Sequence, residues 1–354
     1  MNRLGLDRFS GLYLLAAFIV VFSILAPSTF PTATTLHIIA STQSIAGLAA
    51  LALLIPLIAG HFDLSIGATA NLAGVAAAIM QNNGLLGTIP AVLFAVAIGL
   101  VIGCINGFIV VRFRINSFIT TIAMTSVISA VLIFITGSVE VQQLPPGTFT
   151  ALTQTQLFGF QTVVIYLLVI AVIVWWALER TPAGRYLHAV GANPEAARLT
   201  GIKVDRWSFL SLVASGGLAG LTGVLFVSLT GPALDFGPGL LLPAFAAVFL
   251  GSTQLKPGRM NVWGTLIAIF VLAVGVQGLQ LVTGITWVAP LFDGVALIIA
   301  VGLAVGRERR MSSKGEKPTA LPPGETPHDE GLERLDGLEA ATRPSQAVTG
   351  TPEK

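Results

Sequence analysis

The residue whose type and surroundings most clearly suggest a chemical role is Asp63, a carboxylate inside a long apolar region. A charge in such a setting is costly, and it is a candidate for a functional site. Gly60 and Gly67 flank it and Pro56 precedes it, which suits a broken helix whose freed backbone groups line a cavity. A structural reading is also open, because Asp63 and Ser65 suit the start of a helix, where a side-chain oxygen caps a free N–H.

Other chemistry is scarce. Asp293 is a second carboxylate in an apolar run, where it suits either a functional role or a bond to a neighbouring hydroxyl or backbone group. Cys104 is the only cysteine and the four histidines show no ligand spacing, so we expect no metal site. We find no nucleophile–base pair and assign no catalytic residue, so the chain is not expected to be an enzyme. The sequence has no Gly-Lys dipeptide and therefore no phosphate-binding loop of the usual form.

A short helix is predicted within the connection 179–206. Asn193 is a suitable N-cap, Pro194 suits the first helical position, and Glu195 complements the positive end of the helix dipole. Gly201 can adopt the left-handed conformation that ends a helix. A helix this short is unstable alone, so it must pack on something.

Two readings of this helix stay open: a capped turn on the surface, or a helix that docks on a partner. Glu195 and Arg198 are three residues apart, so they can pair with each other or with a partner. The small side chains of Ala196 and Ala197 permit close approach to a groove. The residues assigned to this unit are Gly191, Asn193, Pro194, Glu195, Ala196, Ala197, Arg198 and Gly201.

The elements around these residues are predicted to be membrane helices. The chain is 54% hydrophobic and 10% charged, against roughly 25% charged in soluble domains. About 20 apolar residues in a helix cross the hydrocarbon core. The sequence therefore predicts an all-α polytopic membrane protein of about ten spans within 1–306. The segments are 10–27, 38–59, 64–81, 88–111, 116–137, 161–178, 208–229, 239–254, 261–282 and 286–305.

The positions of basic residues predict the orientation. With the N-terminus in the cytoplasm, all 19 Lys and Arg residues fall on the cytoplasmic side, as the positive-inside rule requires. Both termini are then cytoplasmic. Residues 307–354 are rich in proline and charge, so they are expected to form a disordered cytoplasmic tail.

The run Gly184–Ile202 resembles the coupling loop of ABC importer permeases of the ribose, xylose and galactose branch, which have the type II importer fold. The resemblance covers roughly 40–306, and its other segments occur in the same order. In the segment Ala59–Gly67, His61 and Phe62 stand where the family has a small residue and isoleucine. Asp293 stands where many relatives have a basic residue. The matching segments are Ala59–Gly67, Asn106-Gly107, Arg114–Thr121, Leu250–Thr253, Gly258 and Gly264–Leu266.

The resemblance implies that the chain is the permease subunit of an ABC importer for a sugar of the pentose or hexose class. It implies a separate ABC ATPase subunit that carries ATP and Mg²⁺, while this chain binds no cofactor. It also implies an extracytoplasmic sugar-binding protein, a second permease subunit that forms a homodimer or is a paired paralogue, and a bacterial cytoplasmic (inner) membrane; no nucleic acid is expected. Asp63, Ser65 and Asp293 are then candidates for the translocation path or gate. The alternative is an ion-coupled secondary transporter that uses Asp63 and Asp293.

Overall fold

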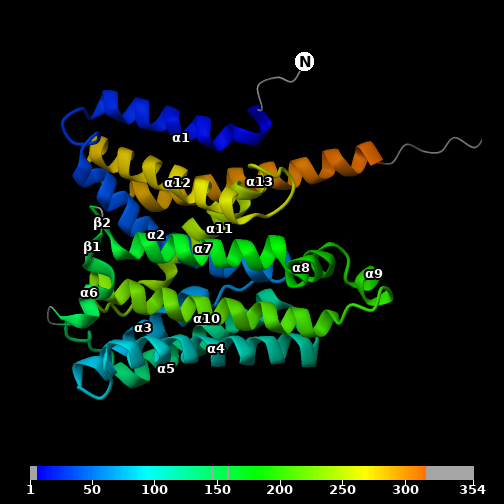
Figure 1. Cartoon of the computed structure of the whole chain (residues 1–354), viewed down its shortest axis with the longest axis horizontal. Helices are drawn as coiled ribbons and strands as arrows, with labels where there is room; N and C mark the ends of the chain where they lie inside the picture. Colours follow the sequence, from blue (N-terminus) through cyan, green and yellow to red (C-terminus); the bar gives the residue numbers. More distant parts are fainter. Residues whose placement is uncertain (1–5, 145–146, 158, 316–354) are drawn as a thin grey trace, which may run out of the picture. The chain divides into compact units, whose positions relative to one another are not determined.

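The computed structural model describes residues 6–144, 147–157 and 159–315. Within these residues the regular secondary structure is helical apart from one hairpin of two-residue strands (Figure 1). The elements are α1 (Leu6–Leu25), α2 (Ala33–Ile58), α3 (Ile66–Asn82), α4 (Thr88–Phe113), α5 (Ser117–Thr136), α6 (Thr148–Gln154), β1 (Gln156–Leu157), β2 (Phe160–Gln161), α7 (Thr162–Arg180), α8 (Pro182–Ala192), α9 (Pro194–Leu199), α10 (Val204–Thr230), α11 (Gly237–Ser252), α12 (Val262–Thr283) and α13 (Val288–Gly315).

Each apolar segment predicted from the sequence coincides with a helix, so the prediction of an all-α polytopic membrane protein is confirmed. Six of the described helices are long and apolar enough to cross a membrane: α2, α4, α5, α7, α10 and α12. Three shorter helical stretches are also apolar: Phe9–Leu25, Gly237–Ser252 and Val288–Leu303. The predicted tail starts at 307, yet α13 continues to Gly315; residues 316–354 lie outside the described part of the chain.

The centre of the helical body is α10, which packs against α4, α3 and α2. Glycines bring these helices into backbone contact. A Cβ on Gly216 would overlap the carbonyl oxygen of Gly99 on α4, and a Cβ on Gly223 would overlap that of Ala70 on α3. Because lipid offers no hydrophobic drive for helices to associate, close packing at small residues is what holds them together.

A non-helical segment separates α2 from α3, and we call residues 59–65 the α2–α3 break. Pro56 lies in the last turn of α2, and Gly60 has a φ of +82°, which favours glycine. Asp63 and Ser65 are each 1% exposed. The break is thus irregular backbone inside the helical body, where each polar group needs a partner from the protein.

Figure 1 shows α8 and α9 at one end of the helical body, and α6 with the β1–β2 hairpin at the opposite end. The link between α10 and α9 is therefore at the first of these ends. We call α8 and α9 together the coupling segment.

The close contact between α4 and α10 gives a test of the packing. Gly216→Val should lower the free energy of unfolding by roughly 1–3 kcal/mol, because the added atoms force apart two backbones. Gly217→Val on the same helix is the control, since a Cβ there meets only the flexible Leu100 side chain. Thermal unfolding in detergent measures both. Equal losses in the two variants would contradict the packing described.

Candidate functional site

The backbone of the α2–α3 break is bonded to a row of hydroxyl groups on α5. The amide of Phe62 donates to Ser117 Oγ (3.0 Å) and the amide of Leu64 donates to Thr121 Oγ1 (3.1 Å). Thr125 Oγ1 donates to the Leu64 carbonyl at 3.3 Å. The three hydroxyls are four residues apart, so they share one face of α5. They replace the backbone bonds that a continuous helix would have made.

The carboxylate of Asp63 ties the break to other helices. Its Oδ1 accepts from the Ser65 amide (3.1 Å) and hydroxyl (2.6 Å), and its Oδ2 accepts from Ser215 Oγ on α10 (2.9 Å). Asn106 on α4 donates from Nδ2 to Ser65 Oγ at 2.9 Å. The bond to the Ser65 amide lies just before α3, whose N-cap residue is Ser65 and has no side-chain capping bond, so Asp63 does not cap the helix as the structural reading expects. The bond to Ser215 adds a cross-link, so Asp63 joins α3 and α10 through one buried side chain.

Asp293 lies elsewhere. It is half-buried on α13, and the structure shows no hydrogen bond from it to any described residue. The neighbouring Phe292 packs on Phe18 of α1. The structure therefore brings Asp63 and Ser65 together, while Asp293 is not part of their network.

The short helix predicted from the sequence is α9. Asn193 caps it, because its Oδ1 accepts from the amides of Glu195 (3.1 Å) and Ala196 (3.0 Å). Gly201 ends it with a φ of +83°, and the amide of Ile202 donates to the Ala197 carbonyl at 3.0 Å. Both capping signals of the sequence thus act as expected.

One of the two small side chains of α9 that were expected to approach a partner's groove is buried within the chain. Ala197 is 4% exposed and packs against Val190 and Val204 of its own chain, so it is not presented to a partner. Its small size serves the packing of α9 on α8 and α10. Ala196 is exposed, and Leu199 is 90% exposed at the end of the helix. Leu199 is therefore the large apolar side chain that α9 presents outward.

Ion pairs connect α9 to the helices beneath it. Arg198 pairs with Glu195 (3.0 Å) and with Asp205 at the start of α10 (3.2 Å). Asp205 also accepts a two-pronged bond from Arg114, at 2.9 and 3.1 Å. These side chains are all partly exposed to solvent, so each pair contributes about 1 kcal/mol or less. The network therefore adds little to the stability of the protein, and its main effect is to orient α9 on α10.

His188 lies on the inner side of α8. Burial, together with the charges of Arg259 and Lys256, lowers its pKa to about 4, although Glu179 acts in the opposite direction. His188 is therefore neutral at pH 7. Lys256 and Glu179, which both act on His188, also form a salt bridge with each other.

A cavity of about 380 Å³ adjoins both the break and the coupling segment. Gly60 and His61 line it from the break, Gly191 and Arg198 from the coupling segment, and Asn116 from α5. The two predicted sites are thus neighbours in space, although about 130 residues separate them in sequence.

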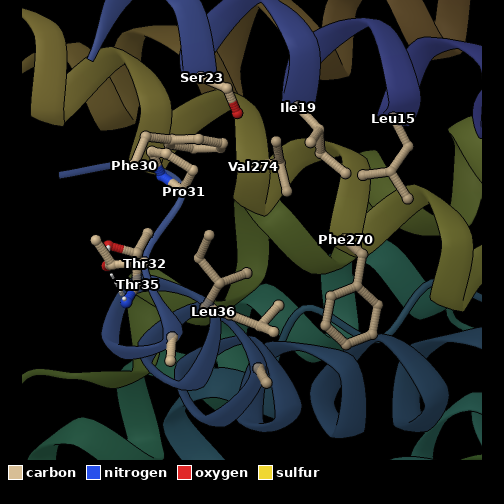
Figure 2. Close-up of a pocket in the computed structure, with 13 residues that line it drawn as sticks. Leu15, Ile19, Ser23, Phe30, Pro31, Thr32, Thr35, Leu36, Phe270 and Val274 are labelled. Atoms are coloured by element: carbon tan, nitrogen blue, oxygen red, sulfur yellow. Dashed lines mark hydrogen bonds between the residues drawn. The ribbon is translucent and has the colours of Figure 1, made fainter. Parts of the chain in front are cut away.

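A second cavity, of about 450 Å³, lies between α1, α2 and α12. In Figure 2 the apolar side chains of Ile19, Leu36 and Phe270 face into it. The hydroxyls of Thr32 and Thr35 are bonded to each other and to the Thr29 carbonyl. This cavity therefore offers few free polar groups to a hydroxyl-rich ligand.

From the sequence, no individual role was assigned to several groups at these sites. They are Leu199 on α9, Asn106 and Arg114 near the end of α4, the α5 hydroxyls, and Ser215 with Asp205 on α10. A signal existed for the α5 hydroxyls, since Ser117, Thr121 and Thr125 recur every four residues in an apolar helix. Spacing alone could not show that this face of α5 contacts the α2–α3 break.

Known proteins resemble the chain over most of its length. Residues 35–301 match the family described as branched-chain amino acid transport system / permease component. The autoinducer 2 import system permease protein LsrC of Enterobacter sp. (strain 638) is 31% identical over 294 residues, which cover 80% of this chain and 82% of that protein.

Two ribose import permease proteins are similarly close. RbsC of Escherichia coli (strain K12) is 30% identical over 81% of this chain and 90% of its own length. RbsC of Bacillus subtilis (strain 168) is 31% identical over 85% of this chain and 92% of its own length.

The carboxylate network gives a test. Asp63→Ala should lower the free energy of unfolding by roughly 1–3 kcal/mol for each buried donor left without an acceptor. Asp63→Asn should be much milder, because its oxygen still accepts from Ser65 and the Ser215 hydroxyl can turn to accept from the new amide. Thermal unfolding in detergent compares them. Equal stability of Asp63→Ala and the unaltered protein would refute the network.

Proposed function

The chain belongs to the family of branched-chain amino acid transport system permease components, and from this we propose that it forms the translocation path of an ABC importer for a sugar of the pentose or hexose class. The relatives named for ribose and for autoinducer 2 support a small hydroxylated substrate. The chain carries the path and the coupling to ATP, and the chemistry of hydrolysis takes place on another subunit.

The observation that carries this proposal is the exposed face of α9. A capped helix of six residues ends in a leucine that is 90% exposed, in a connection rich in charge. Singly exposed apolar side chains are common on protein surfaces, so the assignment of Leu199 as an anchor also draws on the resemblance of this connection to the coupling loop of ABC importer permeases. The partner we assign to this surface is the ABC ATPase subunit, which holds the ATP and Mg²⁺.

We assign ten membrane crossings to α1–α5, α7 and α10–α13, in a bacterial cytoplasmic (inner) membrane. The six long apolar helices and the three shorter apolar stretches support this, and α3 (17 residues) is enclosed among them. The distribution of Lys and Arg supports a cytoplasmic location for both termini and for the coupling segment.

The remaining partners follow from the same function. An extracytoplasmic binding protein delivers the sugar, and a second copy of the permease completes the path. The exposed apolar side chains along α5 support contact with lipid and with that second copy; Ile119, Val127 and Phe134 are examples, at 62%, 54% and 87% exposed. Asp63 and Ser65 are proposed to act at the path or its gate, held by Ser215 and Asn106; Asp293 remains a separate candidate on α13.

The alternative, an ion-coupled secondary transporter, has no support in the geometry. That reading pairs Asp63 and Asp293 as ion sites, yet the oxygens of Asp63 accept from Ser65 and Ser215, and Asp293 lies outside this network. The exposed α9 also has no role in it.

The docking surface predicts the effect of Leu199→Glu. The substitution should weaken association with the ATPase by about tenfold or more, the loss expected when an apolar anchor of an interface is removed. Copurification with the ATPase and sugar uptake should fall together. Leu199→Met is the matched control and should retain both. Normal ATPase recovery and uptake in Leu199→Glu would count against α9 as the docking helix.

The assigned orientation predicts which residues an impermeant thiol reagent reaches in intact cells. In a Cys104→Ala background, Val139→Cys and Asp235→Cys should react from outside, because both side chains are exposed and lie in outer connections. Lys203→Cys, exposed beside the coupling segment, should react only after the cells are opened. External labelling of Lys203→Cys would overturn the orientation.

A further inference from the structure

The backbone of α8 makes close contact with the end of α2 and the α2–α3 break. A Cβ on Gly191 would overlap the Ile58 carbonyl oxygen and would lie 3.1 Å from the amide nitrogen of Gly60. In the other direction, a Cβ on Gly60 would lie 3.5 Å from the Gly191 α-carbon. Here backbone rests on backbone, and no rotatable side chain lies between the two segments.

From this contact we infer that the coupling segment moves the α2–α3 break directly, through Gly191 and residues 58–60. The inference rests on the proposed function, and it assigns the break as the part of the permease that receives the motion of the ATPase. Gly191 and Gly60 are then positioning residues that act through the break.

The other links of the break are softer. Ser117, Thr121 and Ser215 hold it through hydroxyl groups, which reorient when a side chain rotates. A displacement at Ile58–Gly60 therefore shifts the break relative to α5 and α10 without loss of every bond at once. The contact at Gly191 has no such freedom, so it transmits displacement.

The ion pairs of the coupling segment are poorly suited to the same task. Arg198–Asp205 and Arg114–Asp205 join side chains that are 40% to 62% exposed. Such pairs are weak in water and can break and reform at little cost. They set the resting position of α9, while the Gly191 contact passes movement to the body.

The cavity of about 380 Å³ gives the break room to move. Gly60, His61 and Gly191 all contribute to its wall. A close-packed interior resists displacement, whereas a void beside a segment permits it. We call the contact between Gly191 and residues 58–60 the joint. It is thus packed on the side of α8 and open on the side of the cavity.

The break carries a side chain that can report its movement. Phe62 is 38% exposed and lies between Phe118 on α5 (ring centroids 6.3 Å apart) and Phe245 on α11 (6.5 Å). These contacts cross three separate elements. A shift of the break against α5 and α11 must change the surroundings of Phe62.

Phe62→Cys in a Cys104→Ala background tests the inference in the purified complex with the ATPase subunit. The rate of labelling by a thiol reagent is compared without nucleotide and with ATP plus vanadate. We expect the labelling rate to change by about tenfold between the two states, because the free energy of the local opening that exposes the thiol differs between them. Val139→Cys, 67% exposed in an outer connection, is the reference position and should not respond.

Two glycine variants then locate the joint. Gly191→Ala should abolish the nucleotide-dependent change, because the added methyl group displaces the break from its contact. Gly184→Ala is the matched control: its Cβ overlaps the Leu178 carbonyl on α7, so it strains the same helix without touching the break. It should lower thermal stability and keep the labelling response.

The outcomes separate the inference from the proposed function. A complex that hydrolyses ATP without any change at Phe62→Cys overturns the inference and leaves the proposed function standing. A response that survives in Gly191→Ala, or that Gly184→Ala removes equally, also overturns it. A parent chain that does not associate with an ABC ATPase contradicts the proposed function itself.

Discussion

A backbone N–H or C=O that is buried away from water must find its partner inside the protein, and the α2–α3 break is where this chain meets that demand without a helix. The hydroxyls of α5 accept and donate in place of the missing helical bonds, and Asp63 draws α3 and α10 together. The glycine contacts of α10 with α3 and α4 bring these helices close enough for such short side chains to reach. The helical body and the break therefore depend on each other.

The sequence was sufficient to predict the long apolar helices, because long apolar runs have few other solutions in a membrane; it did not predict α6, α8 or the β1–β2 hairpin, which contain no such run. It also gave both ends of α9, since Asn193 and Gly201 are local signals that need no knowledge of the tertiary structure. The partners of Asp63 were not predictable in the same way. Ser215 lies 152 residues away along the chain, and nothing in spacing alone brings it to that carboxylate.

The one misplaced side chain is instructive about short helices. Ala197 was expected to face a partner because it is small, yet α9 must bury something of its own to be stable. Ala197 provides that contact with Val190 and Val204, and the outward face is left to Leu199. Sequence alone gave the helix but not its rotation, because six residues contain too little apolar periodicity to define a face.

The hydrogen-bond network of the α2–α3 break and the contact at Gly191 together connect the cytoplasmic end of the protein to the helical body, and motion can pass along this connection. In the proposed motion the coupling segment and the α2–α3 break move as one, while the glycine-packed pair α4 and α10 stays fixed. Hydrogen–deuterium exchange of the complex with the ATPase, compared with and without ATP plus vanadate, measures this most directly. The account predicts faster exchange at the amides of Phe62 and Leu64 as their bonds to Ser117 and Thr121 open, with α4 and α10 unchanged. A change confined to α9, with the break equally protected in both states, would contradict it.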